Sequence, residues 1–188
     1  MQAQLSYKKL AYTFFVFSLL IFLTAVVLYL LGRRWWCIDG QFFVWAGAST
    51  PHTSQHIFDP YSFSHVLHGF IFLWILRLFL KKRPIEIIFI VAIGIECLGE
   101  IAENSPLIIE RYRTATVALN YFGDSIANSI SDIICAAFGF LFAAAVPWKV
   151  SLATLIVIEI SLLFFIGDNL TLNIIMLINP VSFIFDKK

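Results

Sequence analysis

The chain has 188 residues, of which 60% are hydrophobic and 13% are charged, whereas soluble domains have roughly 45–50% apolar and about 25% charged residues. Its 20 phenylalanines and 5 tryptophans, with a mean hydropathy of +0.88, leave too little polar surface for a water-soluble domain. Soluble enzymes and nucleic-acid-binding proteins are therefore excluded, and a net charge of +1 gives no sign of a polyanionic partner. We expect residues 1–188 to form a single all-α transmembrane domain.

Apolar runs along the chain predict a bundle of five or six transmembrane helices, because about 20 apolar residues cross the hydrocarbon core of a bilayer. The predicted spans are 10–31, 62–80, 85–103, 124–146 and 150–166, with a broken sixth span over 170–185 in the six-helix alternative. Segment 37–61 mixes aromatic residues with glycine, proline and histidine, which predicts a re-entrant or interfacial loop. A second, polar loop is predicted over 104–123.

The basic residues predict how the bundle is inserted, because cytoplasmic loops carry an excess of lysine and arginine. The end of the bundle with the N-terminus would hold Lys8, Lys9, Lys81, Lys82, Arg83 and Lys149, joined by Lys187 and Lys188 if a sixth span exists. The other end would hold Arg33, Arg34, Arg111 and Arg113. The larger group predicts a cytoplasmic N-terminus.

Three predicted spans carry stripes of polar residues, each on one helix face. Ionisable side chains at the centre of a span cost roughly 2.5–3.5 kcal/mol each, so they point to a function. With a rise of about 1.5 Å per residue, the stripes lie at one depth, in the half of the bundle away from the N-terminus. The sequence therefore predicts a polar pocket there. The stripes are His65 and His68, then Glu96, Glu100 and Glu103, then Asp124, Asn128 and Asp132.

The residue types in this pocket permit two kinds of chemistry. Histidine with several carboxylates is a ligand set suited to zinc, magnesium or manganese, and we expect His68, Glu100 and Asp132 to hold such a divalent metal. A metal-bound water would then be the nucleophile, with Glu96 or Glu103 as general base. Metal-free acid–base catalysis by the same residues is equally permitted, because closely packed carboxylates raise the pKa of one of them.

The remaining polar residues are expected to bind the substrate. Arg111 and Arg113 would clamp a phosphate or carboxylate of a headgroup, and His65, Asp124 and Asn128 would line the pocket. The expected partner is therefore a membrane lipid or a lipid-linked substrate, and no nucleic acid. The sequence does not predict an oligomeric state.

Three function classes stay open at this point. The leading hypothesis is an envelope enzyme that acts on a lipid or lipid-linked headgroup. The alternatives are a transporter or ion- or proton-coupled binding protein, and a structural accessory subunit of a membrane complex. A transporter would be favoured by polar residues continuing toward the cytoplasm, but segments 87–95 and 133–146 are apolar. Glu159 lies away from the pocket and is expected to pair with Arg77 in a structural role.

Ordered residue blocks between 33 and 180 resemble a known family. The blocks are Trp35-Trp36-Cys37, Ser54-Gln55-His56, His65-x-x-His68-Gly69, Glu100-x-x-Glu103-Asn104-Ser105-Pro106, Arg111-Tyr112-Arg113, Gly123-Asp124-Ser125-x-x-Asn128-Ser129-x-x-Asp132 and Asp168-Asn169. They resemble a UPF-type family of bacterial multi-pass inner-membrane proteins, found mainly in alphaproteobacteria and defined by a domain of unknown function. The resemblance implies the bacterial inner (plasma) membrane and assigns no activity to any residue. Residues 113–139 are also similar to the last part of VanZ-like membrane proteins, associated with glycopeptide resistance, which points toward the cell envelope.

Overall fold

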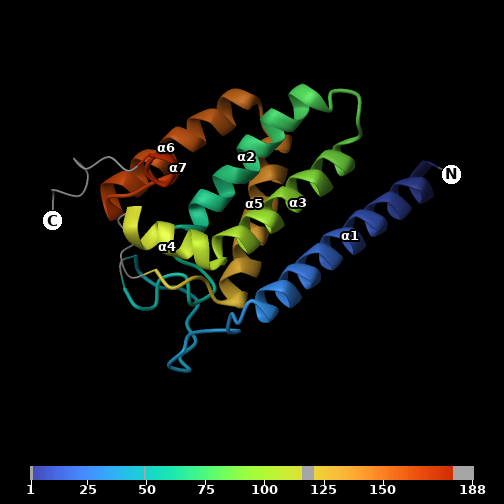
Figure 1. Cartoon of the computed structure of the whole chain (residues 1–188). Coiled ribbons are helices and arrows are strands. Elements are labelled where there is room, and N and C mark those ends of the chain that lie inside the picture. The colour runs from blue at the N-terminus through green and yellow to red at the C-terminus, as the bar shows by residue number, and fades with distance from the viewer. Residues whose placement is uncertain (1, 49, 116–120, 180–188) are drawn as a thin grey trace.

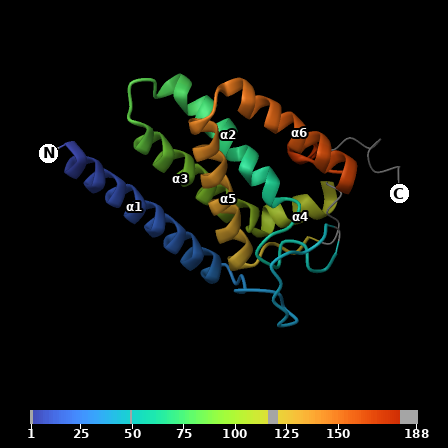
Figure 2. The same cartoon turned by 180° about the vertical axis from the view of Figure 1, so that it is seen from behind.

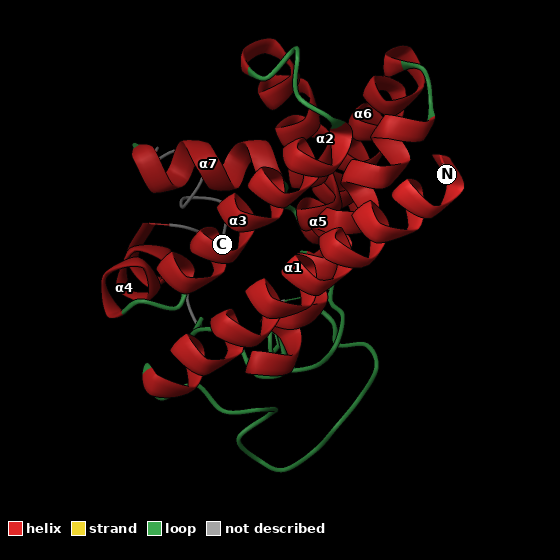
Figure 3. Cartoon of the chain, turned by 90° about the vertical axis from the view of Figure 1, so that its right-hand side faces the viewer, coloured by secondary structure: helices red, strands yellow, loops and turns green. Residues whose placement is uncertain are grey.

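The computed structural model describes residues 2–48, 50–115 and 121–179, and this part of the chain is all-α (Figures 1 and 3). The described residues form no β-strand, and a single isolated β-bridge joins Trp45 and Phe58 in the long loop. The helices are α1 (Gln2–Leu30), α2 (Ser62–Phe79), α3 (Ile85–Glu103), α4 (Pro106–Ala115), α5 (Ile126–Ala145), α6 (Trp148–Ile166) and α7 (Leu170–Ile178). The predicted all-α class is confirmed.

Within the described residues, α1 from Tyr7, α2, α5 and α6 are long and apolar enough to cross a membrane. The predicted third span, α3, begins and ends at the expected residues and packs against α1, α2 and α5. It carries Glu86, Glu96, Glu100 and Glu103, so its composition alone does not identify it as a span. The predicted sixth span is helical only over α7 in the described residues, and 180–185 lie outside them. A nine-residue helix is too short to cross a bilayer.

The predicted loop over 104–123 is wrong for its first half, where the structure has the helix α4. Ser105 precedes this helix, and its hydroxyl accepts a hydrogen bond from the amide of Ile108 at 3.4 Å. Pro106 occupies the first helical position, where a missing amide proton costs nothing. A capping serine followed by proline is therefore the signal that begins α4.

The bundle is built around α2 and α5, with α3 beside both and α1 against α3 (Figures 1 and 2). The core between them is made of close-packed apolar side chains, which include Leu67, Phe70, Ile88, Ala92 and Phe140. Helix α6 contacts α2 and α5, and α7 lies against α4.

Loops gather at one end of the bundle, where α1 and α3 end and α2 and α5 begin; we call this the loop end (Figure 1). The segment after α1 reaches the start of α5, where the amide of Ile126 donates to the carbonyl of Arg34 at 2.7 Å. The long loop before α2 is attached there too, because the amide of Ser125 donates to the carbonyl of Ser54 at 2.9 Å. The N-terminus of α1 lies at the opposite end (Figure 1).

Candidate functional site

His65 lies at the centre of a buried polar cluster between α2, α3 and α5. Its Nδ1 is 2.6 Å from Oε1 of Glu96 and 3.4 Å from Oε1 of Glu100. Its Nε2 is 3.8 Å from Oδ2 of Asp132 on α5. The three carboxylate residues are at most 4% exposed. One imidazole therefore joins acidic residues from two other helices.

His68 lies one turn further along α2 and contacts the same glutamate. Its Nδ1 is 3.1 Å from Oε2 of Glu96 and 3.3 Å from Oε1. The i, i+3 spacing puts both imidazoles on one face of α2, with ring centroids 5.0 Å apart. Among the described residues, the groups whose ligand atoms lie within 4.8 Å of one another include His65, His68 and Glu96 and, separately, His65, Glu100 and Asp132.

This arrangement exchanges the places expected for the two histidines. The sequence predicted His68 beside Glu100 and Asp132, and His65 as a substrate-binding residue. The structure places His65 beside Glu100 and Asp132 and pairs His68 with Glu96.

Several acidic oxygens in the cluster have no hydrogen-bond partner within the described part of the chain. They are both side-chain oxygens of Glu100 and Oδ1 of Asp132. Leaving a buried polar group unsatisfied costs about 1–3 kcal/mol, and more for a charged group. Orphaned atoms of this kind in a native protein call for an explanation such as a bound ion or a proton.

The charges of the cluster lead to the same requirement. Glu96, Glu100 and Asp132 together carry three negative charges when ionised, and His65 and His68 supply at most two positive ones. With all three carboxylates ionised and both imidazoles protonated, the cluster therefore still has a net charge of −1 in a buried site, where an uncompensated charge is very costly. A cation or additional protons must balance it.

Glu103 and Asp124 lie closer to the loop end than this cluster. Glu103 is the last residue of α3 and is half-buried. Asp124 precedes α5 and is held by Asn104, whose Nδ2 donates to Oδ2 of Asp124 at 2.8 Å, while the amide of Asp124 donates to Oδ1 of Asn104 at 2.7 Å. The hydroxyl of Tyr121 is 2.9 Å from both carboxylate oxygens. Burial and the neighbouring Glu103 raise the pKa of Asp124 to about 7.

Asn128 connects the first turn of α5 to the long loop. Its amide donates to the hydroxyl of Ser125, which caps α5, at 3.1 Å. Its side-chain Nδ2 donates to the carbonyl of Ile57 at 3.4 Å. Asp124 and Asn128 were predicted to bind substrate, and in the structure both hold the loop end together.

The two predicted headgroup-binding arginines lie on α4 and contact other groups. Arg111 donates from Nε to the carbonyl of Leu177 at 2.9 Å and from Nη2 to that of Ile178 at 3.3 Å. Arg113 lies 3.7 Å from Glu110 and stacks on the ring of Phe122, 5.0 Å from its centroid. Among the described residues, no hydrogen bond or ion pair joins either arginine to the cluster.

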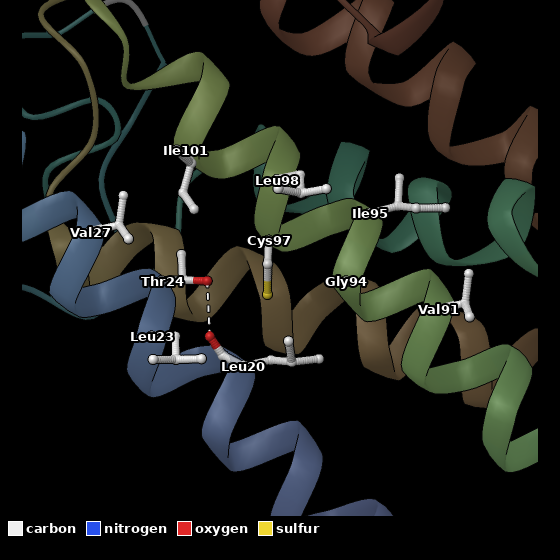
Figure 4. Close-up of a pocket in the computed structure, with 10 residues that line it drawn as sticks. All are labelled: Leu20, Leu23, Thr24, Val27, Val91, Gly94, Ile95, Cys97, Leu98 and Ile101. Atoms are coloured by element: carbon white, nitrogen blue, oxygen red, sulfur yellow. Dashed lines mark hydrogen bonds between the residues drawn. The ribbon is translucent and has the colours of Figure 1, made fainter.

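An apolar groove of about 430 Å³ lies between α1 and α3, on the face of α3 that carries Cys97 (Figure 4). The hydroxyl of Thr24 in its wall donates to the carbonyl of Leu20 at 2.9 Å, so it is satisfied within α1. Cys97 and Ile101 line the groove, and each follows a glutamate of the cluster, Glu96 or Glu100, in sequence. The groove therefore lies at the depth of the cluster.

Sequence reasoning missed Asn104 and Tyr121, which together fix Asp124. Asn104 follows Glu103 directly and is 2% exposed, and its signal was an amide at the end of an acidic helix face. Tyr121 lay in a loop expected to be polar, and nothing in its spacing pointed to Asp124.

Comparison with known proteins assigns the chain to a family. The model "Protein of unknown function (DUF2585)" matches residues 28–187. A UPF0314 protein from Sphingopyxis alaskensis is 45% identical over 172 residues, which cover 91% of this chain and 92% of that protein. UPF0314 proteins from Brucella anthropi and Rhizobium etli are 45% identical over 157 residues (84% and 80% of the two chains) and 42% identical over 183 residues (96% and 94%). No solved structure matches. The chain therefore belongs to the UPF0314 family, as the ordered residue blocks predicted.

Proposed function

We propose that this protein is an enzyme of the bacterial inner membrane that acts on a lipid or lipid-linked headgroup, with a divalent metal held by His65, Glu100 and Asp132. The observation that carries the proposal is the set of buried oxygens on Glu100 and Asp132 that have no hydrogen-bond partner among the described residues and lie beside an imidazole. One imidazole and two carboxylates from three helices form a rigid ligand set suited to zinc, manganese or magnesium.

Such a metal would supply an activated water or polarise a phosphoryl or carbonyl oxygen of the substrate. Glu96, positioned by His65 at 2.6 Å and His68 at 3.1 Å, would act as the proton acceptor. His68 is partly exposed and orients Glu96 from the second side. These residues keep the roles predicted for metal ligands and base, with His65 in the place expected for His68.

The lipid character of the substrate rests on two features. Two of the three helices around the cluster, α2 and α5, are apolar enough to span a membrane, so a substrate would reach it within or beside the bilayer. The groove between α1 and α3 offers an apolar wall for an acyl chain at the same depth. The similarity of residues 113–139 to VanZ-like proteins points to the same compartment and stays a prediction.

The insertion expected from the basic residues completes the proposal. With the N-terminus in the cytoplasm, the loop end and the cluster below it lie toward the outer face of the membrane. A transporter is the less favoured alternative, because the residues of α5 beyond Asp132 that face the core, Ile133, Ala136, Ala137 and Phe140, are apolar and buried. They offer no polar path across the bundle.

The test combines metal content with lipid turnover. The full chain is purified in detergent, stripped of metal, reconstituted with zinc, manganese or magnesium, and incubated with vesicles of a bacterial phospholipid extract. Lipid products are followed by mass spectrometry. We expect binding of about one metal ion, a metal-dependent lipid product, and at least a hundredfold loss of both metal affinity and turnover in Glu100→Gln and Asp132→Asn.

The matched control is Glu86→Gln, which makes the same change at the other end of α3. It should keep the wild-type metal affinity and turnover. Metal binding that is unchanged in Glu100→Gln and Asp132→Asn would overturn the metal site. A folded, metal-loaded protein that leaves every lipid unchanged would instead favour the accessory-subunit alternative.

A further inference from the structure

The long loop before α2 contains a second cluster of metal-ligating side chains, separate from the cluster between the helices. Cys37, His52 and His56 each offer one ligand atom, and these atoms all lie within 4.8 Å of one another. Cys37 is 5% exposed and His56 is 1% exposed, while His52 is half-buried. Two imidazoles and a thiol are thus held together in a segment whose described residues form no helix.

Two of the three distances between these atoms match the edges of a metal tetrahedron. Sγ of Cys37 is 3.5 Å from Nδ1 of His52, and Nδ1 of His52 is 3.1 Å from Nε2 of His56. With zinc bonds of about 2.3 Å to sulfur and about 2.0–2.1 Å to nitrogen, tetrahedral geometry puts S and N about 3.5 Å apart and two N atoms about 3.3 Å apart. These two pairs already have nearly the required spacing, and the third pair lies within 4.8 Å.

We infer that Cys37, His52 and His56 form a zinc site that fixes the long loop over the loop end of the bundle. The spacing His-x-x-x-His places both imidazoles on the same side of a turn, as in many structural zinc sites. Oδ2 of Asp39 lies 3.8 Å from Nε2 of His52, the ring nitrogen that would not bind the metal, so Asp39 would orient this imidazole and water would take the fourth position.

Metal binding requires a defined exchange of protons. In the structure the amide of Phe43 donates to Nδ1 of His56 at 3.2 Å, so the ring proton is on Nε2. Zinc would bind Nε2, move that proton to Nδ1, and release the thiol proton of Cys37 to solvent. No oxidation or reduction takes place. Phe43 is exposed, so water can replace the lost acceptor of its amide.

The proposed site has a structural consequence at the loop end. The same loop contributes the carbonyl of Ser54, which accepts from Ser125, and the side chain of Gln55, whose Nε2 donates to the carbonyl of Gly123 at 2.8 Å. Both contacts lie beside the capped start of α5. Zinc would therefore fix the loop residues that contact the start of α5, close to the proposed active site, without being part of that site.

Cobalt substitution distinguishes this site from the buried polar cluster, because a thiolate-to-cobalt absorption band requires a cysteine ligand and the proposed ligands of that cluster include none. The full chain in detergent is stripped of metal and titrated with Co²⁺. We expect a thiolate-to-cobalt absorption band in the near ultraviolet, release of about one proton, and displacement of cobalt by zinc. Cys37→Ser should abolish the band and weaken zinc binding at this site at least tenfold, whereas Cys135→Ser, on α5, should keep both.

The contradicting results are equally specific. Cobalt binding with no thiolate band, or a band that persists in Cys37→Ser, would overturn the site. If Cys37→Ser fails to fold, X-ray absorption of the wild-type zinc protein decides. It should find one sulfur at about 2.3 Å with imidazole nitrogens at about 2.0 Å, and zinc with only nitrogen and oxygen ligands would refute the proposal.

Discussion

Gly69 of α2 and Gly139 of α5 bring the two helices into backbone contact. A Cβ atom on Gly69 would overlap the carbonyl oxygen of Ala136, and one on Gly139 would overlap the carbonyl oxygen of Val66. Each glycine follows a residue of the cluster along its helix: Gly69 comes directly after His68, and Gly139 lies two turns beyond Asp132. The close approach of these backbones therefore sets the distance between the imidazoles of α2 and the carboxylate of α5.

Alanine at either glycine should push α2 and α5 apart. We expect Gly69→Ala and Gly139→Ala to lower the free energy of unfolding by about 1–3 kcal/mol, because the added methyl groups overlap backbone atoms that cannot rotate away. Thermal unfolding in detergent measures this. The control is Gly99→Ala on α3, where a Cβ meets no atom within 4 Å, and a helical alanine should be stabilising by about 0.5–1 kcal/mol. Equal behaviour of the three variants would refute the backbone-contact argument.

The carboxylates of the cluster should differ in their effect on stability. Glu96 is paired with both imidazoles, so Glu96→Gln should destabilise the metal-free protein. Glu100 and Asp132 carry buried oxygens with no hydrogen-bond partner in the described part of the chain, so Glu100→Gln and Asp132→Asn should stabilise it, by about 1–3 kcal/mol each. Thermal unfolding in the presence of a chelator measures all three. If Glu100→Gln were as destabilising as Glu96→Gln, Glu100 would be a structural residue.

Asp168, between α6 and α7, should give the stability a distinct pH dependence. Burial raises the pKa of Asp168 to about 6, although the hydroxyl of Tyr61 at 3.3 Å and the amide of Asn169 at 2.9 Å both donate to its carboxylate; Glu159 of α6 adds to the rise. The folded state therefore holds the proton more tightly than the unfolded state. Stability from this group is full below the unfolded pKa of about 3.9 and is lost as the pH rises to about 6.

The expected loss over this window is about 2–3 kcal/mol, since each pKa unit is worth about 1.4 kcal/mol. The measurement is the midpoint of thermal unfolding from pH 4 to pH 7, in wild type and in Asp168→Asn. As the pH falls from 7 to 4, the unfolding midpoint of the wild type should rise by several degrees relative to that of Asp168→Asn. A constant difference across the range would show that Asp168 titrates normally.

The helices could be predicted from sequence because burial in a bilayer depends on local composition. Apolar runs located α2 and α3 to within one residue at each end. The helix α4 was missed because its composition is polar, and it depends on the capping hydroxyl of Ser105 rather than on hydropathy. Local signals of this kind are weaker than a twenty-residue apolar run.

Contacts between distant segments were harder to predict. The helix periods did place His65, Glu96, Glu100 and Asp132 on facing stripes, but a difference of one turn decided which histidine meets which carboxylate. Glu159 was expected to pair with Arg77, yet its oxygens accept from the amides of Leu170 and Thr171 and cap α7. Its structural role was foreseen and its partner was not, because the sequence does not show where a reversing helix begins.

Variants of Arg111 can distinguish a structural role of this residue from a role in substrate binding. Its guanidinium donates to the carbonyls of Leu177 and Ile178 at the end of α7. The helix dipole also favours a positive charge at this end. Arg111→Ala should therefore detach the end of α7 from α4 and increase amide hydrogen exchange across α7 at least tenfold. Arg113→Ala, which removes only an exposed pair with Glu110 and a contact with Phe122, should leave that exchange unchanged.

Lipid turnover in the same variants tests the alternative, in which Arg111 binds the lipid headgroup. If Arg111 acts only through α7, Arg111→Ala should change turnover by no more than the loss of stability explains, and the apparent KM for the lipid should stay at the wild-type value. A large rise in KM with normal hydrogen exchange in α7 would mean that Arg111 leaves the carbonyls of Leu177 and Ile178 to bind the headgroup. That is the role which the sequence predicted for Arg111. The measurement that distinguishes them is the combination of exchange and KM, because each role moves one of the two.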